Sequence, residues 1–447
     1  MTGADKPRGR EPKLDTSPPR GMRDVLPDEV ELRDRTLATI LDSYRRRGFQ
    51  RIETPAVESL KLLTRGEGGE NEKLIFKILK RGERLSAARD TEEALADLGL
   101  RFDLTVPLAR YYAHHHARLP QPLKAIQIGP VWRAERPQHG RFRQFTQCDI
   151  DILGVRSEIA EIELILATAD VLSVLGLDGL TVRLNDRRIL AAVARHCGFD
   201  DARFDSVFIA LDKLDKIGRG GVTEELRGQG HGPRQVETLM GLLDDTGQGA
   251  AKPEELARRL GEDADAAVWR GLTRIIETVE QDAGGRFRIA FDPTLVRGMS
   301  YYTGPIFEIR YRDSASSIAG GGRYDQMIGK LLGRDVPATG FSIGFERVIG
   351  LLGERGGADL GGSERTAFIF DEDTPQLVRI LARARTLWDQ GQIVLLELRA
   401  KKLGRQLHDL KSRGFRRIVV FDADGQPRDA DLTERTSEDR GDRGSAR

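Results

Sequence analysis

The segment from Gly129 to Asp151, GPVWRAERPQHGRFRQFTQCDID, constrains the fold more than any other stretch of this chain. Residues Ala125 to Trp132 and Phe142 to Leu153 carry the β-branched and aromatic side chains that favour strands. Between them lies a polar turn around Pro137 to Gly140. Because two strands joined by one short turn pair antiparallel, we expect a β-hairpin within a largely antiparallel sheet.

Helical and strand patterns flank this hairpin. Apolar residues recur with a period of about 3.6 from Pro27 to Gly48, which predicts an amphipathic helix. Ser157 to Leu175 is acidic near its start and predicts a second helix. Phe49 to Pro55 and Leu104 to Tyr112 have the composition of strands. Strand clusters linked by long helices favour a mixed α+β domain over a doubly wound parallel sheet.

The pattern changes twice further along the chain. It is mostly helical from Asn185 to about Ala283 before strand character returns, which indicates an inserted helical module. From Thr366 strands and helices alternate as βαβαβ, which predicts a small separate α/β domain. The predicted divisions are a flexible N-terminal tail at 1–17, a main domain at 18–184 and 284–360, its insertion at 185–283, the C-terminal domain at 366–424 and a disordered tail at 425–447.

Composition excludes several classes of protein. No window offers the roughly 18 uninterrupted apolar residues of a membrane span, and the first residues lack the apolar run of a secretory signal. The two cysteines, Cys148 and Cys197, lack the spacing of a zinc site or disulfide framework. We therefore expect a cytoplasmic protein without a metal site, zinc or an organic cofactor. The net charge of +1 argues only mildly against RNA, since local charge counts for more than the total.

A phosphate-binding function follows from the arginines of the hairpin. Neither GxxxxGK[ST] nor GxGxxG occurs in the chain, so a glycine loop for nucleotides has no support. Arg133, Arg136, Arg141 and Arg143 lie around Glu135, and alternate residues of a strand share one face. Guanidinium groups bind phosphate oxygens in pairs, while a carboxylate accepts from the adenine amino group, so ATP is a suitable ligand. The alternative is a solvated basic hairpin with salt bridges.

The string RAERPQHGRFRQF resembles motif 2 of the class II aminoacyl-tRNA synthetases, in the form found in the histidyl enzymes. Further segments resemble that family in the right order, over most of residues 18 to 425. They are PPRGMRDVLPDE at Pro18–Glu29, RIETPAVES (motif 1) at Arg51–Ser59, RFDLTVPLARY at Arg101–Tyr111, LVRGMSYYTGPIFEI (the histidine-specific motif) at Leu295–Ile309, AGGGRYDQMIG at Ala319–Gly329 and ATGFSIGFERV (motif 3) at Ala338–Val348. The resemblance implies an antiparallel-sheet catalytic domain, a helical insertion, an anticodon-binding-like C-terminal domain and histidine-tRNA ligase activity.

The resemblance also implies how ATP would be held. Arg133 and Arg347 would grip its phosphates from opposite sides, and Arg141 would reach the outer phosphates. Glu135 would read the adenine, and Phe145 would stack on its ring. Fixed positive charge, with Mg²⁺ that enters with ATP, would stabilise the transition state.

Histidine would be recognised beside ATP. Arg297 would contact the histidine carboxylate and the α-phosphate, which makes it an expected catalytic residue with Arg133 and Arg347. An α-ammonium group needs acceptors, and a neutral imidazole needs a donor and an acceptor. The matching residues are Asp103, Thr105 and Gln147 for the ammonium group, Asp151 and Tyr302 for the imidazole, and Tyr301 as a further wall of the pocket.

Partners follow from the same resemblance. Arg136 and Gln138 match positions near the acceptor end of tRNA(His), and motif 1 implies a homodimer. The basic helix expected at Lys401 to Arg413 suits phosphate contacts to the anticodon arm, and an ordinary solvated helix explains it equally well.

The chain departs from the family pattern in two places. Ser300 replaces the usual aspartate before the tyrosines, and the C-terminal domain is short. Two alternatives therefore stay open. One is a histidine-binding regulatory paralogue of ATP phosphoribosyltransferase, which generally lacks the insertion and several of the arginines. The other is a paralogue that activates histidine for an acceptor other than tRNA.

Overall fold

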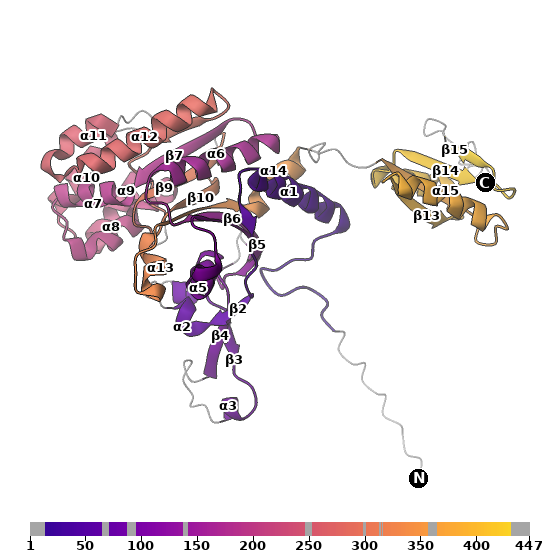
Figure 1. Ribbon diagram of the computed structural model, residues 1–447, viewed down its shortest axis with the longest axis horizontal. Helices are drawn as coiled ribbons and strands as arrows, with labels where there is room; N and C mark the ends of the chain where they lie inside the picture. The colour runs from indigo at the N-terminus through magenta and orange to yellow at the C-terminus, as the bar shows by residue number, and fades with distance from the viewer. Residues whose placement is uncertain are drawn as a thin grey trace, which may run out of the picture. The chain divides into compact units, whose positions relative to one another are not determined.

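The computed structural model describes residues 14–64, 71–86, 95–136, 142–245, 253–297, 301–312, 314, 316–355 and 364–430. The chain divides into two compact units, Met1–Ala358 and Asp359–Arg447 (Figure 1). Over the described ranges, no helix is both long and apolar enough to cross a membrane.

An eight-stranded sheet forms the centre of the first unit, with the strand order β1-β5-β6-β11-β10-β9-β7-β8. All neighbouring strands are antiparallel except the pairs β1–β5 and β7–β8. The predicted hairpin is its β5–β6 pair, and the predicted α+β class is confirmed. The strands are β1 (Gln50–Arg51), β5 (Leu123–Trp132), β6 (Gln144–Leu153), β7 (Leu180–Asp186), β8 (Arg288–Phe291), β9 (Pro305–Tyr311), β10 (Ser317–Arg323) and β11 (Ala338–Gly344).

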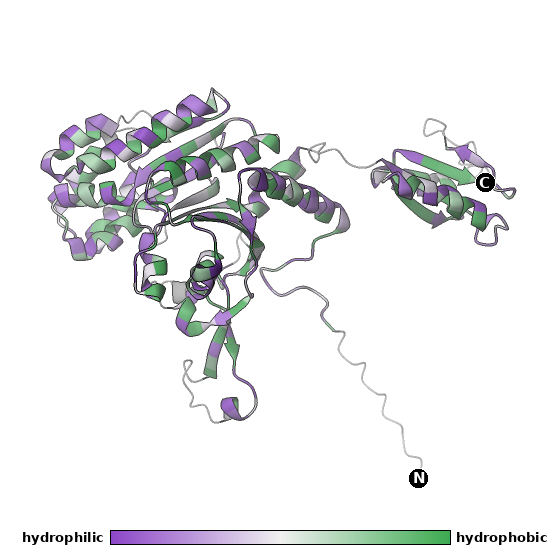
Figure 2. Cartoon of the chain, in the orientation of Figure 1, coloured by the Kyte–Doolittle hydropathy of each residue, from purple (hydrophilic) through white to green (hydrophobic). Residues whose placement is uncertain are grey.

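Helices cover both faces of this sheet (Figure 1). On one side lie α1 (Pro27–Arg46), α6 (Ile159–Val174) and α14 (Phe345–Glu354). The first of these begins at a proline with Asp28 and Glu29 in its first turn, and it buries Leu32, Thr36, Ile40 and Tyr44 at a spacing of four residues. Figure 2 shows hydrophilic and hydrophobic residues interleaved along α1, as expected when one face is buried, whereas α6 is buried on most sides between α1, α12 and the sheet.

On the other side, α5 (Thr105–His115) and α13 (Asp325–Leu332) share a core with Leu123 and Leu153 of the sheet. The strand predicted for Leu104 to Tyr112 was therefore wrong. Leu108, Ala109 and Tyr112 of α5 are buried at helical spacing, and Pro107 is tolerated because it lies in the first turn. Burial against α13 outweighs the β-branched composition of Thr105 and Val106.

In sequence, helices α7 to α12 follow β7 and precede β8, and these two strands are parallel neighbours in the sheet. The helical segment therefore leaves the sheet after β7 and returns beside the same strand. The side chains of Asp186 and Asp265 accept backbone N–H bonds at the starts of α7 and α12. The bounds are α7 (Arg187–His196), α8 (Phe204–Leu211), α9 (Leu214–Gly228), α10 (Pro233–Asp245), α11 (Pro253–Leu260) and α12 (Ala266–Ala283).

A small antiparallel sheet, ordered β2-β4-β3, lies apart from the main one (Figure 1). It consists of β2 (Val57–Ser59), β3 (Lys77–Leu79) and β4 (Ala96–Leu100), with α2 (Leu60–Leu63) beside it and α3 (Glu83–Ser86) between β3 and β4 in sequence. Val57, Leu79 and Leu98 leave apolar side chains exposed on it.

The second unit is a four-stranded sheet, ordered β13-β12-β14-β15, with two helices. Its β12 (Arg365–Phe370), α15 (Leu377–Asp389), β13 (Ile393–Leu398), α16 (Leu403–Ser412) and β14 (Arg417–Phe421) match the predicted βαβαβ order. The basic helix expected at Lys401 to Arg413 is the shorter α16.

The disorder predicted from residue 425 was wrong for residues 425–430. Pro427–Asp429 form β15, which pairs antiparallel with β14 after a turn at Gly425 with φ +70°. The Asp422 carboxylate accepts backbone N–H bonds from Asp424 and Gln426 within that turn. Pairing thus orders a polar segment at the sheet edge, where a proline is tolerated. Residues 431–447 lie outside the described part of the chain.

Candidate functional site

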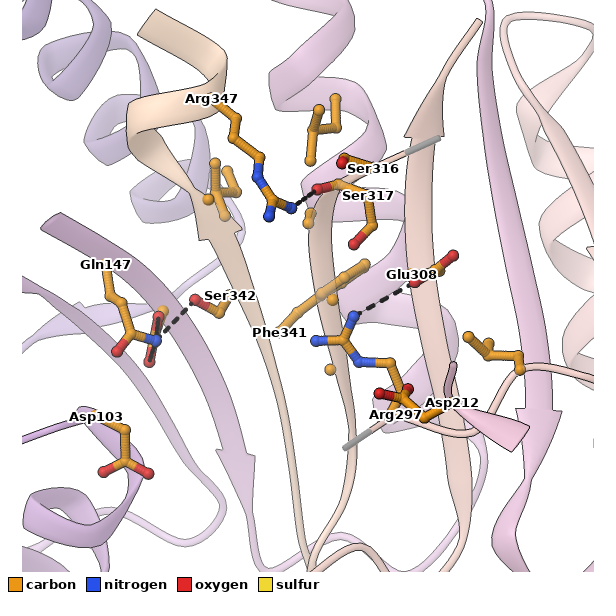
Figure 3. Close-up of a pocket in the computed structure, with 18 of the residues that line it drawn as sticks. Asp103, Gln147, Asp212, Arg297, Glu308, Ser316, Ser317, Phe341, Ser342 and Arg347 are labelled. Carbon is orange, nitrogen blue, oxygen red and sulfur yellow. Dashed lines mark hydrogen bonds and ion pairs between the residues drawn. The ribbon is translucent and has the colours of Figure 1, made fainter. Parts of the chain in front are cut away.

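A cavity of about 640 Å³ lies over the main sheet (Figure 3). Its lining comes from β6, β9, β10 and β11, from the segment around Arg297, and from Asp212 to Lys216 at the join of α8 and α9. These segments are far apart in sequence, so the sheet order is what brings them together.

The strand β6 contributes an acidic row. Gln147, Asp149 and Asp151 alternate along it and therefore face the same side, where all three line the cavity. Opposite them on β11 stand small residues: Gly344, Ser342 and Gly340. A Cβ at Gly340 would overlap the Asp151 carboxylate, so glycine at this position makes room for that side chain.

Two buried carboxylates line the cavity. Asp151 accepts a hydrogen bond of 2.5 Å from the Tyr324 hydroxyl, and burial raises its pKa to about 7. Asp103, just before α5, accepts a bond of 3.1 Å from the Val106 N–H, and burial raises its pKa to about 6. Thr105 lines the cavity beside it. Both carboxylates can therefore bind a cation or a further hydrogen-bond donor.

An aromatic corner adjoins Asp151. The ring centroids of Tyr301 and Tyr302 are 4.8 Å apart with an interplanar angle of 64°, and the Tyr301 ring is 6.0 Å from the Tyr324 ring. Tyr301 and Tyr302 line the cavity. Such a corner accommodates a planar ring and offers phenol groups for hydrogen bonding.

Arg297 lies in the segment that follows β8, and its guanidinium group packs against β10. A Cβ at Gly320 would overlap its guanidinium group, so the guanidinium lies directly against the strand backbone. Its Nη1 is 3.4 Å from Glu308 (Figure 3), and no described residue accepts a bond from its Nε. Burial opposes its charge, yet Tyr302, Glu308, Asp212 and Tyr301 together outweigh burial and hold the pKa of Arg297 above its ordinary value. It is a fixed cation with free donor capacity.

The other expected cations line the same cavity. Arg133 stacks over the Phe145 ring at 5.0 Å and donates from Nε to the Phe102 carbonyl at 3.0 Å. Arg347, at the start of α14, is exposed and donates to the Ser317 carbonyl (Figure 3). Glu135 also lines the cavity. One cavity thus combines arginines with a carboxylate row.

The structure places Arg136 away from this cavity and does not describe three other residues of interest. Arg136 is exposed and is absent from the cavity wall. Arg141 and Gln138 lie outside the described residues, as does Ser300.

Sequence reasoning missed several residues of the wall. Asp149 lies between Gln147 and Asp151 in the same alternating row, so the period of two could have identified it. Tyr324, Glu308 and Asp212 carry no such signal, because only the strand order and the insertion place them at the cavity.

This chain is similar to known proteins over most of its length. Residues 21–348 match the family model described as "Histidyl-tRNA synthetase". A histidine–tRNA ligase of Leifsonia xyli subsp. xyli is 46% identical over 417 residues, which cover 91% of this chain and 96% of the relative. The crystal structure of a histidyl-tRNA synthetase from Nostoc sp. PCC 7120 superimposes with a TM-score of 0.75 at 26% identity, covering 93% of this chain and 97% of that one.

A further structure shares the fold. It is described as an ATP phosphoribosyltransferase regulatory subunit/histidyl-tRNA synthetase from Bacillus halodurans C, and it superimposes with a TM-score of 0.73 at 23% identity over 92% of this chain and 99% of that one. The fold by itself therefore does not separate a ligase from a regulatory relative.

Proposed function

This chain belongs to the histidyl-tRNA synthetase family, and we propose that it activates histidine with ATP and transfers the histidyl group to the 3′ end of tRNA(His). The observation that carries the proposal is the single cavity that holds both the carboxylate row of β6 and the arginines Arg133, Arg297 and Arg347. The first suits an ammonium group and an imidazole, and the second suits a triphosphate.

In the activation step, the histidine carboxylate attacks the α-phosphorus of ATP and diphosphate leaves. Arg297 holds the attacking carboxylate and the α-phosphate oxygens, while Arg133 and Arg347 hold the phosphates from either side. Arg141 reaches the outer phosphates. Glu135 reads adenine and Phe145, whose ring lines the cavity, stacks on it. Mg²⁺ enters as part of the ATP substrate. Catalysis is positional and electrostatic, with no side chain acting as nucleophile.

Histidine is selected by its two ends. Asp103, Thr105 and Gln147 face the α-ammonium group, and Asp151 with Tyr302 faces the imidazole. Because Asp151 is buried and its pKa is raised to about 7, an apolar side chain in place of imidazole would leave a buried acid without a ligand partner. Rejection of apolar amino acids follows from that cost.

Transfer to tRNA uses surfaces outside the cavity. Arg136 and Gln138 contact the acceptor end of the tRNA, and helices α7 to α12 contact its acceptor stem. The second unit contacts the anticodon arm. The catalytic unit pairs with a second copy, and the exposed apolar residues Val57, Leu79 and Leu98 of the small sheet support such a contact. Since charged tRNA serves translation, the reaction takes place in the cytoplasm.

A regulatory paralogue is the second candidate, because a structure with that description shares the fold. The arginines Arg133, Arg297 and Arg347 favour the ligase, since a protein that only binds histidine has no need of three cations at the phosphate end.

The deciding measurement is diphosphate exchange with each amino acid in turn, followed by charging of bulk tRNA. We expect histidine-dependent exchange and charging of tRNA(His). Absence of exchange would exclude the ligase, and exchange without charging would favour a paralogue with another acceptor. Arg297→Ala should abolish exchange and leave the dimer intact by light scattering, whereas Arg195→Ala, an exposed arginine of α7, should retain both.

A further inference from the structure

The carboxylates of the cavity floor have different surroundings. Asp103, Asp149 and Asp151 are each at most 3% exposed, and none of them forms a salt bridge with any described residue. The Tyr324 hydroxyl occupies one oxygen of Asp151, and the start of α5 supplies N–H donors to Asp103, with Arg133 nearby. These two acids are therefore partly compensated by the protein.

Asp149 has neutral hydrogen-bond partners, and the positive charges of Arg133 and Arg101 attract it from beyond salt-bridge distance. Its oxygens lie 3.5 Å from the Gln147 side-chain nitrogen, a long contact, and the Ser342 hydroxyl is its other polar neighbour. Both partners are neutral. Burial, with repulsion from Asp151, raises the pKa of Asp149 well above its ordinary value, so a cation bound beside it would stabilise its charged form.

Two acceptors beside Asp149 are also unused. Asp103 Oδ2 and Gln147 Oε1 are buried and accept no hydrogen bond from any residue that the structure describes. Buried acceptors without partners are rare in folded proteins, and both line the cavity. An ammonium group carries three N–H donors and one positive charge, so it can satisfy both acceptors and still face one carboxylate.

We propose that Asp149 provides the counter-charge for the α-ammonium group of histidine and thereby makes the site specific for a free, charged α-amino group. The inference rests on the proposed function, and it adds a specificity residue to the contacts of Asp103, Thr105 and Gln147. It also assigns a separate task to each acid of β6: Asp149 binds the ammonium end and Asp151 the imidazole end.

The test compares two ligands on two variants. Histidine and imidazolepropionate differ by the amino group, and calorimetry gives the affinity of each for the wild type, Asp149→Asn and Asp151→Asn. We expect Asp149→Asn to weaken histidine at least about 30-fold, as for loss of one partner of a buried charge pair. Imidazolepropionate should change less than about 3-fold, since it has no ammonium group for Asp149 to bind. Asp151→Asn is the matched control and should weaken both ligands.

Kinetics provide an independent readout. In Asp149→Asn the KM for histidine should rise while the KM for ATP stays within about twofold, because uniform ground-state binding of one substrate is lost. Asp149→Ser, which removes the charge with a smaller side chain, must give the same split between the two ligands.

Equal weakening of both ligands, or no weakening of histidine, would overturn the role of Asp149 while leaving the ligase proposal intact. If the wild-type protein itself neither binds histidine nor supports exchange, the proposed function fails first. The two failures are therefore distinguishable.

Discussion

Replacing Gly320 by alanine should disable the site without disturbing the fold. An added Cβ would overlap the terminal guanidinium atoms of Arg297, which are the far end of a flexible side chain and can move away. The backbone itself tolerates alanine, and alanine is favoured over glycine in a strand interior by roughly 0.5–1 kcal/mol. We therefore expect unchanged or slightly higher stability, with Arg297 displaced from the reacting groups.

The expected loss is the contribution of one fixed cation to the transition state. Removal of one such preorganised donor lowers kcat by about 10²–10³, or roughly 3–4 kcal/mol. Diphosphate exchange measures that loss, and urea unfolding measures stability. Gly350→Ala on α14 is the control, because a Cβ there meets no atom within 4 Å.

A double-mutant cycle refines the test. Once Arg297 is replaced by alanine, Gly320→Ala should cost nothing further, since its effect acts through that side chain. Exchange within about threefold of wild type in Gly320→Ala, or additive losses in the double variant, would refute the placement of Arg297.

Three other changes should have separate signatures. Burial raises the pKa of Asp151 to about 7 from an unfolded value near 3.8, so the folded protein binds the proton of this carboxyl group more tightly than the unfolded chain does. The resulting stabilisation is complete below pH 3.8 and is lost as the pH rises through about 7, which changes the free energy of unfolding by about 4 kcal/mol. Asp151→Asn should remove that slope from urea unfolding free energies between pH 4 and 8, and parallel curves for both proteins would contradict it. Tyr324→Phe removes the 2.5 Å hydrogen bond to Asp151 and should raise the KM for histidine about tenfold at constant KM for ATP; an unchanged histidine KM would exclude that role. Asp215→Asn breaks the ion pairs that join the start of α9 to Arg183 on β7 and Arg310 on β9, so limited proteolysis should cut helices α7 to α12 faster at nearly unchanged global stability, and an unaltered cleavage rate would count against this docking contact.

Local sequence patterns predicted much of the fold. The hairpin of β5 and β6, the helix at Pro27–Arg46 and the alternation of the second unit all follow from periods of 2 and 3.6 residues, which depend only on neighbours in the chain. The errors at α5 and β15 have different causes. Leu108 and Tyr112 are buried against α13, which lies far away in sequence, whereas Pro427–Asp429 pair with β14 in a local hairpin whose polar composition does not indicate a strand.

The features of the site also divide into those that the sequence predicts and those that depend on tertiary contacts. The sequence by itself determined the alternating arginines and acids of the hairpin and, through family resemblance, the identity of most contacting residues. Only the tertiary structure decided that Gly320 and Gly340 leave room for Arg297 and Asp151, that the Tyr324 hydroxyl donates to Asp151, and that Asp149 forms no salt bridge with any described residue. Those relations depend on the register between β6, β10 and β11, which long-range packing sets and no local pattern encodes.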